Sequence, residues 1–392
     1  MRTFTVAERR ARLGRRHHLA YPAALSEVTD AVLGLHATDP ATPYLSLWSR
    51  VADFTVTDLD EALYARREVV KQLAMRRTLW LVTADRWPVV QAVAGTRVAE
   101  AESRRLIADV QKAGVAADGA EWLAAARTAV LAYLDAHGPT GAADLRAALP
   151  ELAGNWDPAP GKRWGGPTPL SPRVLTVLGA RGEIVRGPNR GGWTVSRPLW
   201  APTAAWLSGS ATAAPEAADP DAAGTELVRT WLRAFGPATV EDVKWWFGNT
   251  LTWARRTLAD VGAVQVDLHG TPGVALPDDL EPEPDAEPWC ALLPGLDVTT
   301  MGWVDRDWYL DGLRDQVFDR NGNAGPTVWA DGRVVGGWRH DDGGRVDLQI
   351  VSDLSRDARK TLQRKADELT EWLDGTRVKP RFPSPLSKGG PG

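Results

Sequence analysis

Two stretches of the chain repeat the same order of apolar and polar positions. The first begins at Ala129 (AVLAYLDAHGPTGAADLRAAL) and the second at Glu226 (ELVRTWLRAFGPATVEDVKWWF). In each, a helical apolar pattern runs into Gly-Pro, where glycine ends a helix and proline prevents its continuation. Thr140 and Thr239 are then predicted to cap a second helix. This order of helix, tight turn and helix predicts a helix-turn-helix in each copy.

A third helical segment and two short β runs follow each copy. After the first copy come PRVLTVLGARGEIV and the turn-containing RGPNRGGWTV, and after the second comes TWARRTLADVGAVQVDLHGTPGVAL. Glycine-rich turns between β runs are typical of hairpins. Three helices followed by a β-hairpin predict a winged-helix unit. A more diverged third copy is predicted at the start of the chain, with helical patterns at 26–36 and 43–52 and a wing strand at 78–82.

The last part of the chain has a different pattern. The segment PTVWADGRVVGGWRHDDGGRVDLQIV alternates short β runs with Asp331-Gly332 and Gly343-Gly344 turns, which predicts a small β-barrel or curved sheet. SRDARKTLQRKADELTEWL predicts a closing amphipathic helix, and FPSPLSKGGPG a disordered tail. The predicted fold class is α+β, with tandem winged-helix units and a C-terminal β-barrel-like domain.

These patterns divide the chain into segments, with two polar linkers. SGSATAAPEAADPDAAGT is predicted to be flexible because it is rich in Ala, Pro and Asp, and DDLEPEPDAEPW is a second, acidic linker. The predicted segments are an N-terminal winged-helix-like unit with the candidate active site at 1–115, a second winged helix at 116–207, a linker at 208–225, a third winged helix at 226–280, and a β-rich domain with its closing helix at 289–380.

Composition limits the chemistry that the chain can carry. Its single cysteine, Cys290, excludes an internal disulfide and a cysteine-based zinc site, and the six histidines lack metal-ligand spacing. We therefore expect neither a metal nor a cofactor. No apolar run is long enough to span a membrane and the N-terminus lacks the apolar core of a signal peptide, so we expect a protein of the bacterial cytoplasm and nucleoid with no membrane partner.

Charge argues against a uniformly basic nucleic-acid binder. Lys and Arg total 46 against 50 Asp and Glu, a net charge of −4, so any DNA footprint has to be local. One candidate basic cluster is the run Arg9 to His18 (RRARLGRRHH), and a second lies between Arg66 and Arg77. A solvated helix face is the alternative interpretation of either cluster.

Three stretches together resemble one family. VLGLHATDPATPYLSLWSRV, LAMRRTLWLVTAD and ALLPGLDVTTMGW are similar to the winged-helix DNA glycosylases that include an azinomycin-resistance alkylpurine glycosylase and its bacterial crosslink-repair relative. The resemblance covers nearly the whole chain. It implies three tandem winged helices around double-stranded DNA, a C-terminal β-domain, and monofunctional hydrolysis that excises alkylated, bulky or crosslinked purines. We expect a monomer with damaged duplex DNA as its partner.

The resemblance also places a catalytic motif. The family carries Gln–aliphatic–Gln or Gln–aliphatic–Asp where this chain has His36-Ala37-Thr38, followed by Asp39. The implied catalytic residues are therefore His36, Thr38 and Asp39. Asp39 can stabilise an oxocarbenium-like sugar, and His36 can hold or deprotonate a water. Asp39-Pro40 is equally typical of a turn in which Thr38 and Asp39 cap the next helix.

The remaining candidate residues are predicted to contact DNA. They are Arg50, at the end of YLSLWSR, Arg76, Arg77 and Thr78 before the first wing strand, and Arg190 at a wing tip. No lysine lies beside the motif, so a Schiff-base lyase is not expected. The alternative to a glycosylase is a non-catalytic winged-helix DNA-binding protein, either a regulator or a damage-shielding protein, because both glutamines of the motif are replaced.

Overall fold

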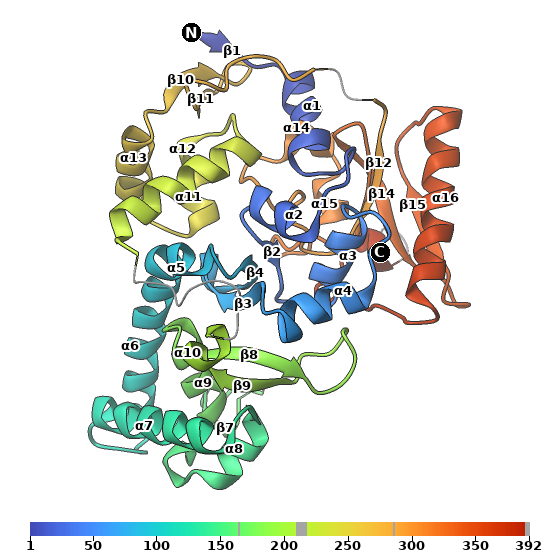
Figure 1. Ribbon diagram of the computed structural model, residues 1–392. Helices are drawn as coiled ribbons and strands as arrows, with labels where there is room; N and C mark the ends of the chain where they lie inside the picture. The colour runs from blue at the N-terminus through green and yellow to red at the C-terminus, as the bar shows by residue number, and fades with distance from the viewer. Residues whose placement is uncertain (164, 209–217, 285–286, 389–392) are drawn as a thin grey trace. The chain divides into compact units, whose positions relative to one another are not determined.

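The computed structural model describes residues 1–388, apart from 164, 209–217 and 285–286. The chain divides into two compact units (Figure 1). Unit 1 consists of Met1–Leu59 with Asp221–Gly392, and unit 2 of Asp60–Pro220. The predicted division into five segments is finer than this one and stays a prediction. Both units mix helices with small sheets, which confirms an α+β fold.

Unit 2 is built from helices around short antiparallel strand pairs. Its elements are η1 (Glu61–Ala65), β3 (Val69–Leu73), η2 (Met75–Arg77), β4 (Leu79–Thr83), α5 (Trp87–Val90), η3 (Gln91–Gly95), α6 (Thr96–Lys112), α7 (Gly119–His137), β5 (Thr140–Gly141), α8 (Ala142–Ala148), η4 (Pro150–Leu152), β6 (Asn155–Trp156), β7 (Thr168–Pro169), α9 (Ser171–Ala180), β8 (Ile184–Asn189), β9 (Pro198–Pro202) and α10 (Thr203–Leu207). Its core is aliphatic, drawn from α6, α7, α9 and β8, with Trp200 of β9 at its edge.

The first repeat of the sequence pattern lies in unit 2. Helix α7 ends where predicted, with Gly138 next at a φ of 74°, a backbone conformation that suits glycine. Strand β5 pairs antiparallel with β9, through Thr140 and Trp200, and β9 pairs with β8. The prediction that Thr140 caps a helix is wrong. Because Thr140 belongs to a strand, α8 starts only after Gly141, with no side-chain cap.

The wing of this repeat is longer than predicted. The return strand β9 begins at Pro198, whereas the pattern placed it at Trp193–Val195, which form a turn. Asn189 stabilises this loop, since its side chain donates to the carbonyl oxygen of Gly192 at 3.2 Å and accepts from the Arg197 amide at 2.6 Å. These bonds close the loop between the two strands.

Unit 1 combines the two ends of the chain. Its elements are β1 (Arg2–Thr3), α1 (Val6–Arg16), α2 (Leu25–Ala31), β2 (Leu35–His36), α3 (Thr42–Trp48), α4 (Val56–Asp60, whose last residue falls in unit 2), α11 (Pro220–Phe235, whose first residue falls in unit 2), α12 (Val240–Phe247), α13 (Leu251–Asp260), β10 (Val264–Asp267), β11 (Pro272–Ala275), β12 (Cys290–Leu293), α14 (Asp307–Leu310), α15 (Arg314–Val317), β13 (Thr327–Ala330), β14 (Arg333–His340), β15 (Val346–Ile350), α16 (Arg356–Leu373) and α17 (Pro385–Lys388).

The second repeat, in unit 1, has the same connectivity as the first. After α11, Ala238 forms an antiparallel bridge with Val274 of β11, as β5 does with β9 in the first repeat. Thr239 caps α12 as predicted. Its hydroxyl accepts from the Asp242 amide at 3.0 Å, and the Asp242 carboxylate accepts from the Thr239 amide at 2.9 Å. Strand β1 adds in parallel to β10, so this hairpin gains a third strand from the N-terminus.

The C-terminal part of unit 1 contains an open sheet. Strands β12, β13, β14 and β15 form a four-stranded antiparallel sheet in that order, and the predicted Asp331-Gly332 and Gly343-Gly344 turns join β13 to β14 and β14 to β15. The expected barrel is corrected, because within the described residues β12 and β15 remain edges and do not pair. Helix α16, the predicted closing helix, packs against β12 and β15, while α14 and α17 contact β14.

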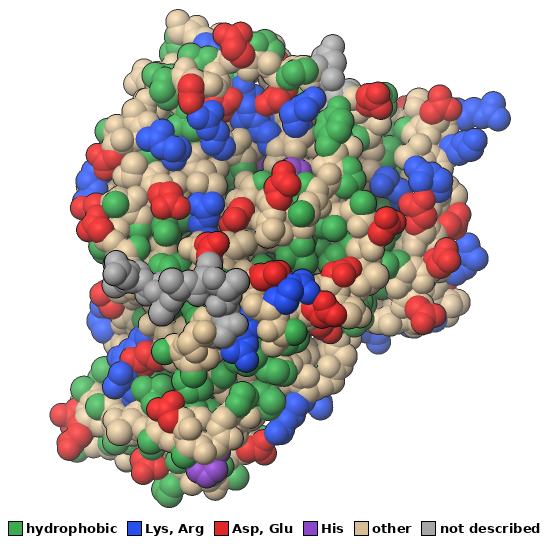
Figure 2. All heavy atoms as spheres, viewed as in Figure 1, with side chains coloured by type: hydrophobic (Ala, Val, Ile, Leu, Met, Phe, Trp, Pro, Cys, Tyr) green, Lys and Arg blue, Asp and Glu red, His purple; other side chains and the backbone are tan. Residues whose placement is uncertain are grey.

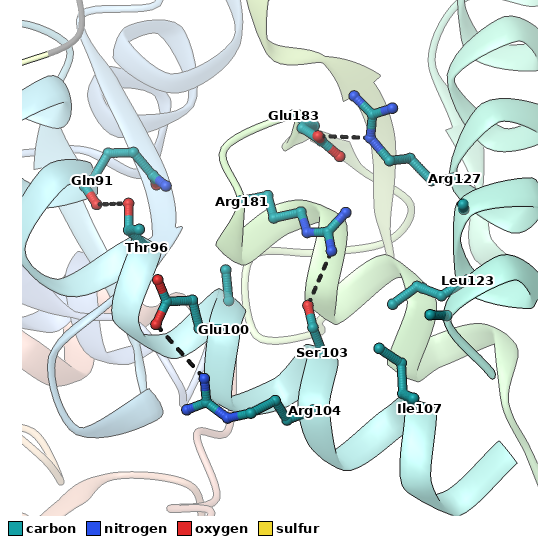
Figure 3. Close-up of a pocket in the computed structure, with 13 residues that line it drawn as sticks. Gln91, Thr96, Glu100, Ser103, Arg104, Ile107, Leu123, Arg127, Arg181 and Glu183 are labelled. Carbon is teal, nitrogen blue, oxygen red and sulfur yellow. Dashed lines mark hydrogen bonds and ion pairs between the residues drawn. The ribbon is translucent and has the colours of Figure 1, made fainter. Parts of the chain in front are cut away.

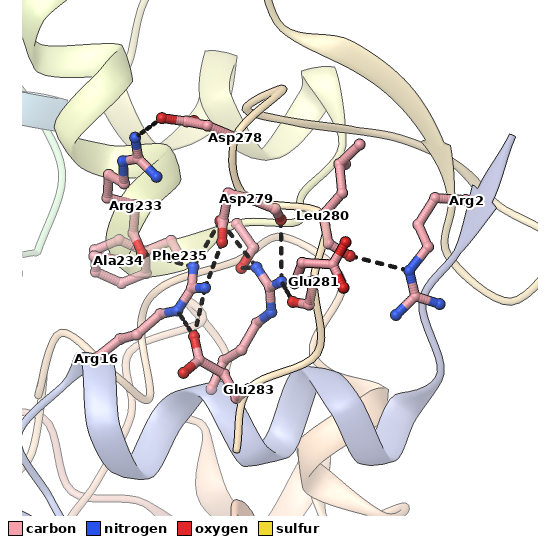
Figure 4. A network of polar contacts seen from close by, with 12 residues as sticks. Arg2, Arg16, Arg233, Ala234, Phe235, Asp278, Asp279, Leu280, Glu281 and Glu283 are labelled. Atoms are coloured by element: carbon pink, nitrogen blue, oxygen red, sulfur yellow. Dashed lines mark hydrogen bonds and ion pairs between the residues drawn. The ribbon is translucent and has the colours of Figure 1, made fainter.

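Both predicted linkers carry ordered structure where they are described. Half of the first, 208–225, lies outside the described residues, and its last six residues belong to α11, in which proline occupies the first helical position. In the second, Asp279 accepts from Arg12 at 2.9 Å and from Arg16 at 2.6 and 2.8 Å (Figure 4). Glu283 also pairs with Arg16. The acidic segment is thus held against α1 by ion pairs.

Candidate active site and nucleic-acid interface

The turn after α2 positions the candidate catalytic motif. Leu33 and Gly34 adopt φ values of 58° and 101°, and the Gly34 amide donates to the Thr29 carbonyl at 2.7 Å, which ends the helix. The chain then enters the short strand β2, which contains His36, and α3 begins at Thr42. The motif is therefore a short connection between two helices of unit 1, fixed by a strained turn on one side.

Asp39 is a buried carboxylate with two backbone partners. Asp39 is only 7% exposed. Its Oδ1 accepts a hydrogen bond from the Ala41 amide at 3.2 Å, and its Oδ2 accepts one from the Arg381 amide at 2.9 Å. Burial raises the pKa of Asp39, while the two amides and the Arg381 charge oppose this rise. Asp39 is therefore a carboxylate whose proton affinity exceeds that of an exposed aspartate.

His36 and Thr38 lie against the same turn. His36 is 3% exposed, and its Nδ1 accepts from the Thr38 amide over 3.4 Å. A neutral imidazole that accepts at Nδ1 carries its proton on Nε2. The Thr38 carbonyl oxygen accepts from Nη1 of Arg381 at 3.2 Å. The structure thus adds a residue from the C-terminal segment, Arg381, to the three residues that the sequence brings together.

Arg381 was missed because it lies between the predicted β-rich domain, which ends at residue 380, and the predicted disordered tail, which begins at Phe382. A signal was present in the sequence, since Arg377, Lys379 and Arg381 recur at every second position just before proline-rich residues. All three are exposed, and the chain beyond them is ordered up to α17. Basic residues at alternate positions of an extended segment share one side of it.

The prediction that Arg50 contacts DNA is corrected. Arg50 is fully buried in unit 1, and each of its five N–H groups has an acceptor. It pairs with both oxygens of Asp297 at 2.7 and 2.9 Å, and it donates to the His17 and Ser46 carbonyls and to the Thr299 hydroxyl. Because all its donors are used inside unit 1, Arg50 stabilises the core and has no N–H group free to bind a phosphate.

The β3–β4 hairpin presents two arginines in a strained turn. Arg76 and Arg77 have φ values of 54° and 60°, conformations that cost free energy in residues other than glycine. Arg77 is exposed and pairs with Glu102 at 2.7 Å. The Thr78 hydroxyl donates to the Met75 carbonyl at 2.8 Å and so has no hydrogen left for a phosphate. Thr78 therefore braces a turn in which Arg77 is exposed and Arg76 is half-buried.

Arg190 borders a second basic surface of unit 2. A cavity of about 380 Å³ lies between α8, α9 and the β8–β9 hairpin and is lined by Arg186, Arg190 and Arg197 together with Trp200. Arg190 is exposed and pairs with Asp144 at 2.7 Å, and the Arg186 guanidinium lies 4.9 Å from the Trp200 ring centre. Three arginines around one cavity form a basic surface suited to phosphate contacts, whereas Trp200 is only 7% exposed and belongs to the core, so it offers no ring for a base to stack on.

A larger cavity of about 790 Å³ lies along α6 and α7 of unit 2 (Figure 3). It contains none of the predicted site residues. Arg127 pairs with Glu183 at 2.7 Å across it, and Arg181 donates to Ser103 at 3.2 Å. These two polar contacts connect α7 and α6 to the residues that follow α9, so they stabilise the packing of the helices around the groove.

The N-terminal basic cluster is neutralised within unit 1. Besides the pairs of Arg12 and Arg16 with Asp279, Arg10 pairs with Asp311, and the Arg9 guanidinium lies 4.1 Å from the Trp308 ring centre. On the face shown in Figure 2, Lys and Arg side chains are intermingled with Asp and Glu, in keeping with the net charge of −4. The cluster Arg9 to His18 therefore organises the unit and leaves little free charge for DNA.

The described residues contain neither a membrane-spanning helix nor a cluster of metal ligands. No helix among them has both the length and the apolar character needed to cross a membrane. In the same part of the chain, no three His, Cys, Asp or Glu side chains gather closely enough to hold a metal ion.

Comparisons with known proteins agree over most of the chain. The family described as "DNA glycosylase AlkZ-like" matches residues 29–372. An interstrand DNA cross-link repair glycosylase of Streptomyces sahachiroi is 29% identical over 181 residues, which cover 42% of this chain and 45% of that protein. The structure of the DNA glycosylase AlkZ from the same organism superposes with a TM-score of 0.73 at 20% identity, covering 97% of this chain and 99% of that one. The match to the curated relative thus spans about half its length, whereas the fold is shared throughout. The chain belongs to the AlkZ-like family of DNA glycosylases.

Proposed function

We propose that this protein is a monofunctional DNA glycosylase that hydrolyses the N-glycosidic bond of alkylated or bulky-adducted purines in duplex DNA, with His36, Thr38 and Asp39 as its catalytic residues. The observation that carries the proposal is the Asp39 carboxylate, buried beside His36 in a chain that matches the glycosylase family over 29–372. A curated relative acts on interstrand crosslinks by name, which supports a bulky lesion as substrate.

The chemistry needs few groups because an N7-alkylated purine is already cationic. As the C1′–N bond breaks, the base leaves with the bonding electron pair, and this pair neutralises the base. The oxocarbenium-like sugar is stabilised by the negative charge of Asp39. A water oxygen then bonds to C1′ and its proton passes to Asp39, whose raised pKa suits a proton acceptor. His36, with its proton on Nε2, orients the water as a hydrogen-bond donor.

DNA is held, in this proposal, through phosphate contacts that require no particular base sequence. The two repeats with matching connectivity act as winged helices, and Arg76, Arg77 and Arg190 contact phosphates. Replacing Arg76 and Arg77 together by Ala should weaken binding to all duplexes alike and make the slope of log K against log salt less negative by about 0.9 per lost phosphate contact. Binding confined to one operator sequence would instead favour a regulator.

The test of catalysis is base release from duplexes containing N7-methylguanine or a bulky purine adduct. Asp39→Asn should slow release by about 100-fold, or ~2.7 kcal/mol of transition-state stabilisation. The control is Asp53→Asn, an exposed carboxylate of unit 1 whose φ of 51° asparagine also tolerates. It should leave the rate unchanged.

One observation favours the alternative, a winged-helix protein that binds DNA without cleaving it. Asp39 and His36 are both almost fully buried. The Asp39 side chain also accepts a hydrogen bond from the Ala41 amide, two residues later, which is typical of an aspartate that stabilises a turn before a helix. If wild-type protein releases no base from either duplex while Asp39→Asn lowers only its stability, the alternative replaces the proposal.

A further inference from the structure

The segment that follows α16 crosses unit 1 as a fixed strap, here defined as residues 377–388. At its start, the Val378 amide donates to Nε2 of His340 at 3.2 Å. At its end, Ser384 is 0% and Leu386 4% exposed, so both are buried. Gly337 of β14 permits this approach, since a Cβ there would lie 2.9 Å from Cβ of Leu386. The strap is therefore anchored on both sides of residue 381.

Arg381 reaches the candidate active site from the middle of the strap. Its main-chain amide donates to Asp39 at 2.9 Å, and its guanidinium donates through Nη1 to the Thr38 carbonyl at 3.2 Å. The side chain is exposed, and in the part of the chain that the structure describes its guanidinium makes no further hydrogen bond. Nε and Nη2 therefore keep donors that face solvent beside the motif.

An anionic partner suits these donors. A buried carboxylate near a DNA strand repels the phosphates that flank the target nucleotide, so a cation beside Asp39 is needed for a strand to come close. Guanidinium donors bind phosphate oxygens in a bidentate geometry and are the residues most used for this purpose. Lys379, two residues earlier and also exposed, adds charge to the same segment.

We propose that Arg381 is a phosphate-binding and positioning residue of the candidate active site: its guanidinium binds a backbone phosphate of the strand that carries the damaged nucleotide, and its main-chain amide holds the Asp39 carboxylate. This inference rests on the proposed glycosylase function. Residue 381 lies beyond the residues, 29–372, that the family match covers, so the family likeness does not assign this role.

Binding and cleavage together test the proposal. Affinity for a duplex with a tetrahydrofuran abasic-site analogue is measured at several salt concentrations, and base release from an N7-methylguanine duplex is measured against pH. Arg381→Ala should weaken binding about 10-fold at low salt and make the salt slope less negative by about 0.9. The rate of base release should fall on acidification, and Arg381→Ala should move this fall, the acid limb of the pH profile, to higher pH. The reason is that the Arg381 charge lowers the pKa of Asp39.

Matched variants distinguish a phosphate contact of Arg381 from a purely structural role in holding the strap. Arg381→Lys should restore the wild-type pH dependence, since it keeps the charge, but only part of the affinity, because an ammonium group cannot bind a phosphate in the bidentate geometry. Lys388→Ala removes an exposed cation from the other end of the strap and should change neither. If thermal melting shows that Arg381→Ala is destabilised, Arg381→Gln takes its place, because it keeps a long side chain with a donor but no charge.

The outcomes distinguish this inference from the proposed function. If wild-type protein releases base but Arg381→Ala keeps the wild-type salt slope and pH profile, the inference is wrong and the glycosylase proposal stands. If wild-type protein releases no base, the glycosylase proposal fails, and the salt slope alone decides whether Arg381 binds phosphate.

Discussion

The buried ion pair of Arg50 and Asp297 predicts a large loss of stability on a single substitution. In Arg50→Leu, the Asp297 carboxylate keeps its bonds from the Ser46 hydroxyl and the Thr299 amide but loses the buried guanidinium with which it pairs. Removing one partner of a buried pair costs about 3–5 kcal/mol because a charge stays behind without compensation. We therefore expect the free energy of unfolding to fall by about 4 kcal/mol.

Urea unfolding, followed by circular dichroism, measures this loss. The midpoint should fall with little change in the slope m. Arg364→Leu, which breaks the exposed pair with Glu368 on α16, is the control and should cost only about 0.3–0.5 kcal/mol. Replacing Arg50 and Asp297 together by Leu should recover only part of the loss, because no unpaired charge is then buried but the Ser46 hydroxyl and the Thr299 amide lose their acceptor.

The dependence on pH gives a second check. Burial by itself raises the pKa of Asp297, but Arg50 and the hydrogen bonds outweigh it and lower that pKa. In wild type this stabilisation is present above the unfolded pKa of about 3.9 and is lost as pH falls through the lower folded value. Without Arg50, burial raises the pKa of Asp297, so the difference in unfolding free energy between wild type and Arg50→Leu should shrink on acidification.

If Arg50→Leu is as stable as wild type and instead binds DNA with a reduced salt slope, Arg50 is a DNA contact and the reasoning is refuted.

Three further predictions follow from single contacts. Because burial raises the pKa of Asp39, base release should decline on acidification at a pH above the usual aspartate range, and Asp39→Asn should remove this limb from the pH profile; an unchanged limb would assign it to another group. Thr239→Ala removes the capping box of α12 and should cost about 1 kcal/mol of unfolding free energy, whereas Thr140→Ala should cost less because Thr140 caps no helix; equal losses in urea unfolding would contradict this. Gly337→Ala should displace the strap through the contact with Leu386, which limited proteolysis detects as faster cleavage within 377–388; an unchanged cleavage rate would show that the strap tolerates the methyl group.

Features that depend on neighbouring residues could be predicted from the sequence. Gly138 ends α7 because glycine tolerates a positive φ next to a proline, and Thr239 caps α12 because Asp242 is three residues away. The Asp331-Gly332 turn between β13 and β14 is of the same kind. Each of these features is decided by a few consecutive residues, so the local pattern is enough.

Features that depend on partners far along the chain could not be predicted. Thr140 has the local pattern of a helix cap, but pairing with Trp200 places it in a strand. The alternating strands predicted a barrel or a curved sheet, and only the pairing order leaves β12 and β15 as open edges.

The candidate site shows the same limit. The sequence by itself determined that His36, Thr38 and Asp39 lie together, because they are consecutive or nearly so in the chain. Only the tertiary structure decided that Arg50 faces Asp297, 247 residues away, and that Arg381 meets Asp39, 342 residues away. The physical reason is that burial and ion pairing depend on which distant segments share a core, and no short-range pattern encodes that choice.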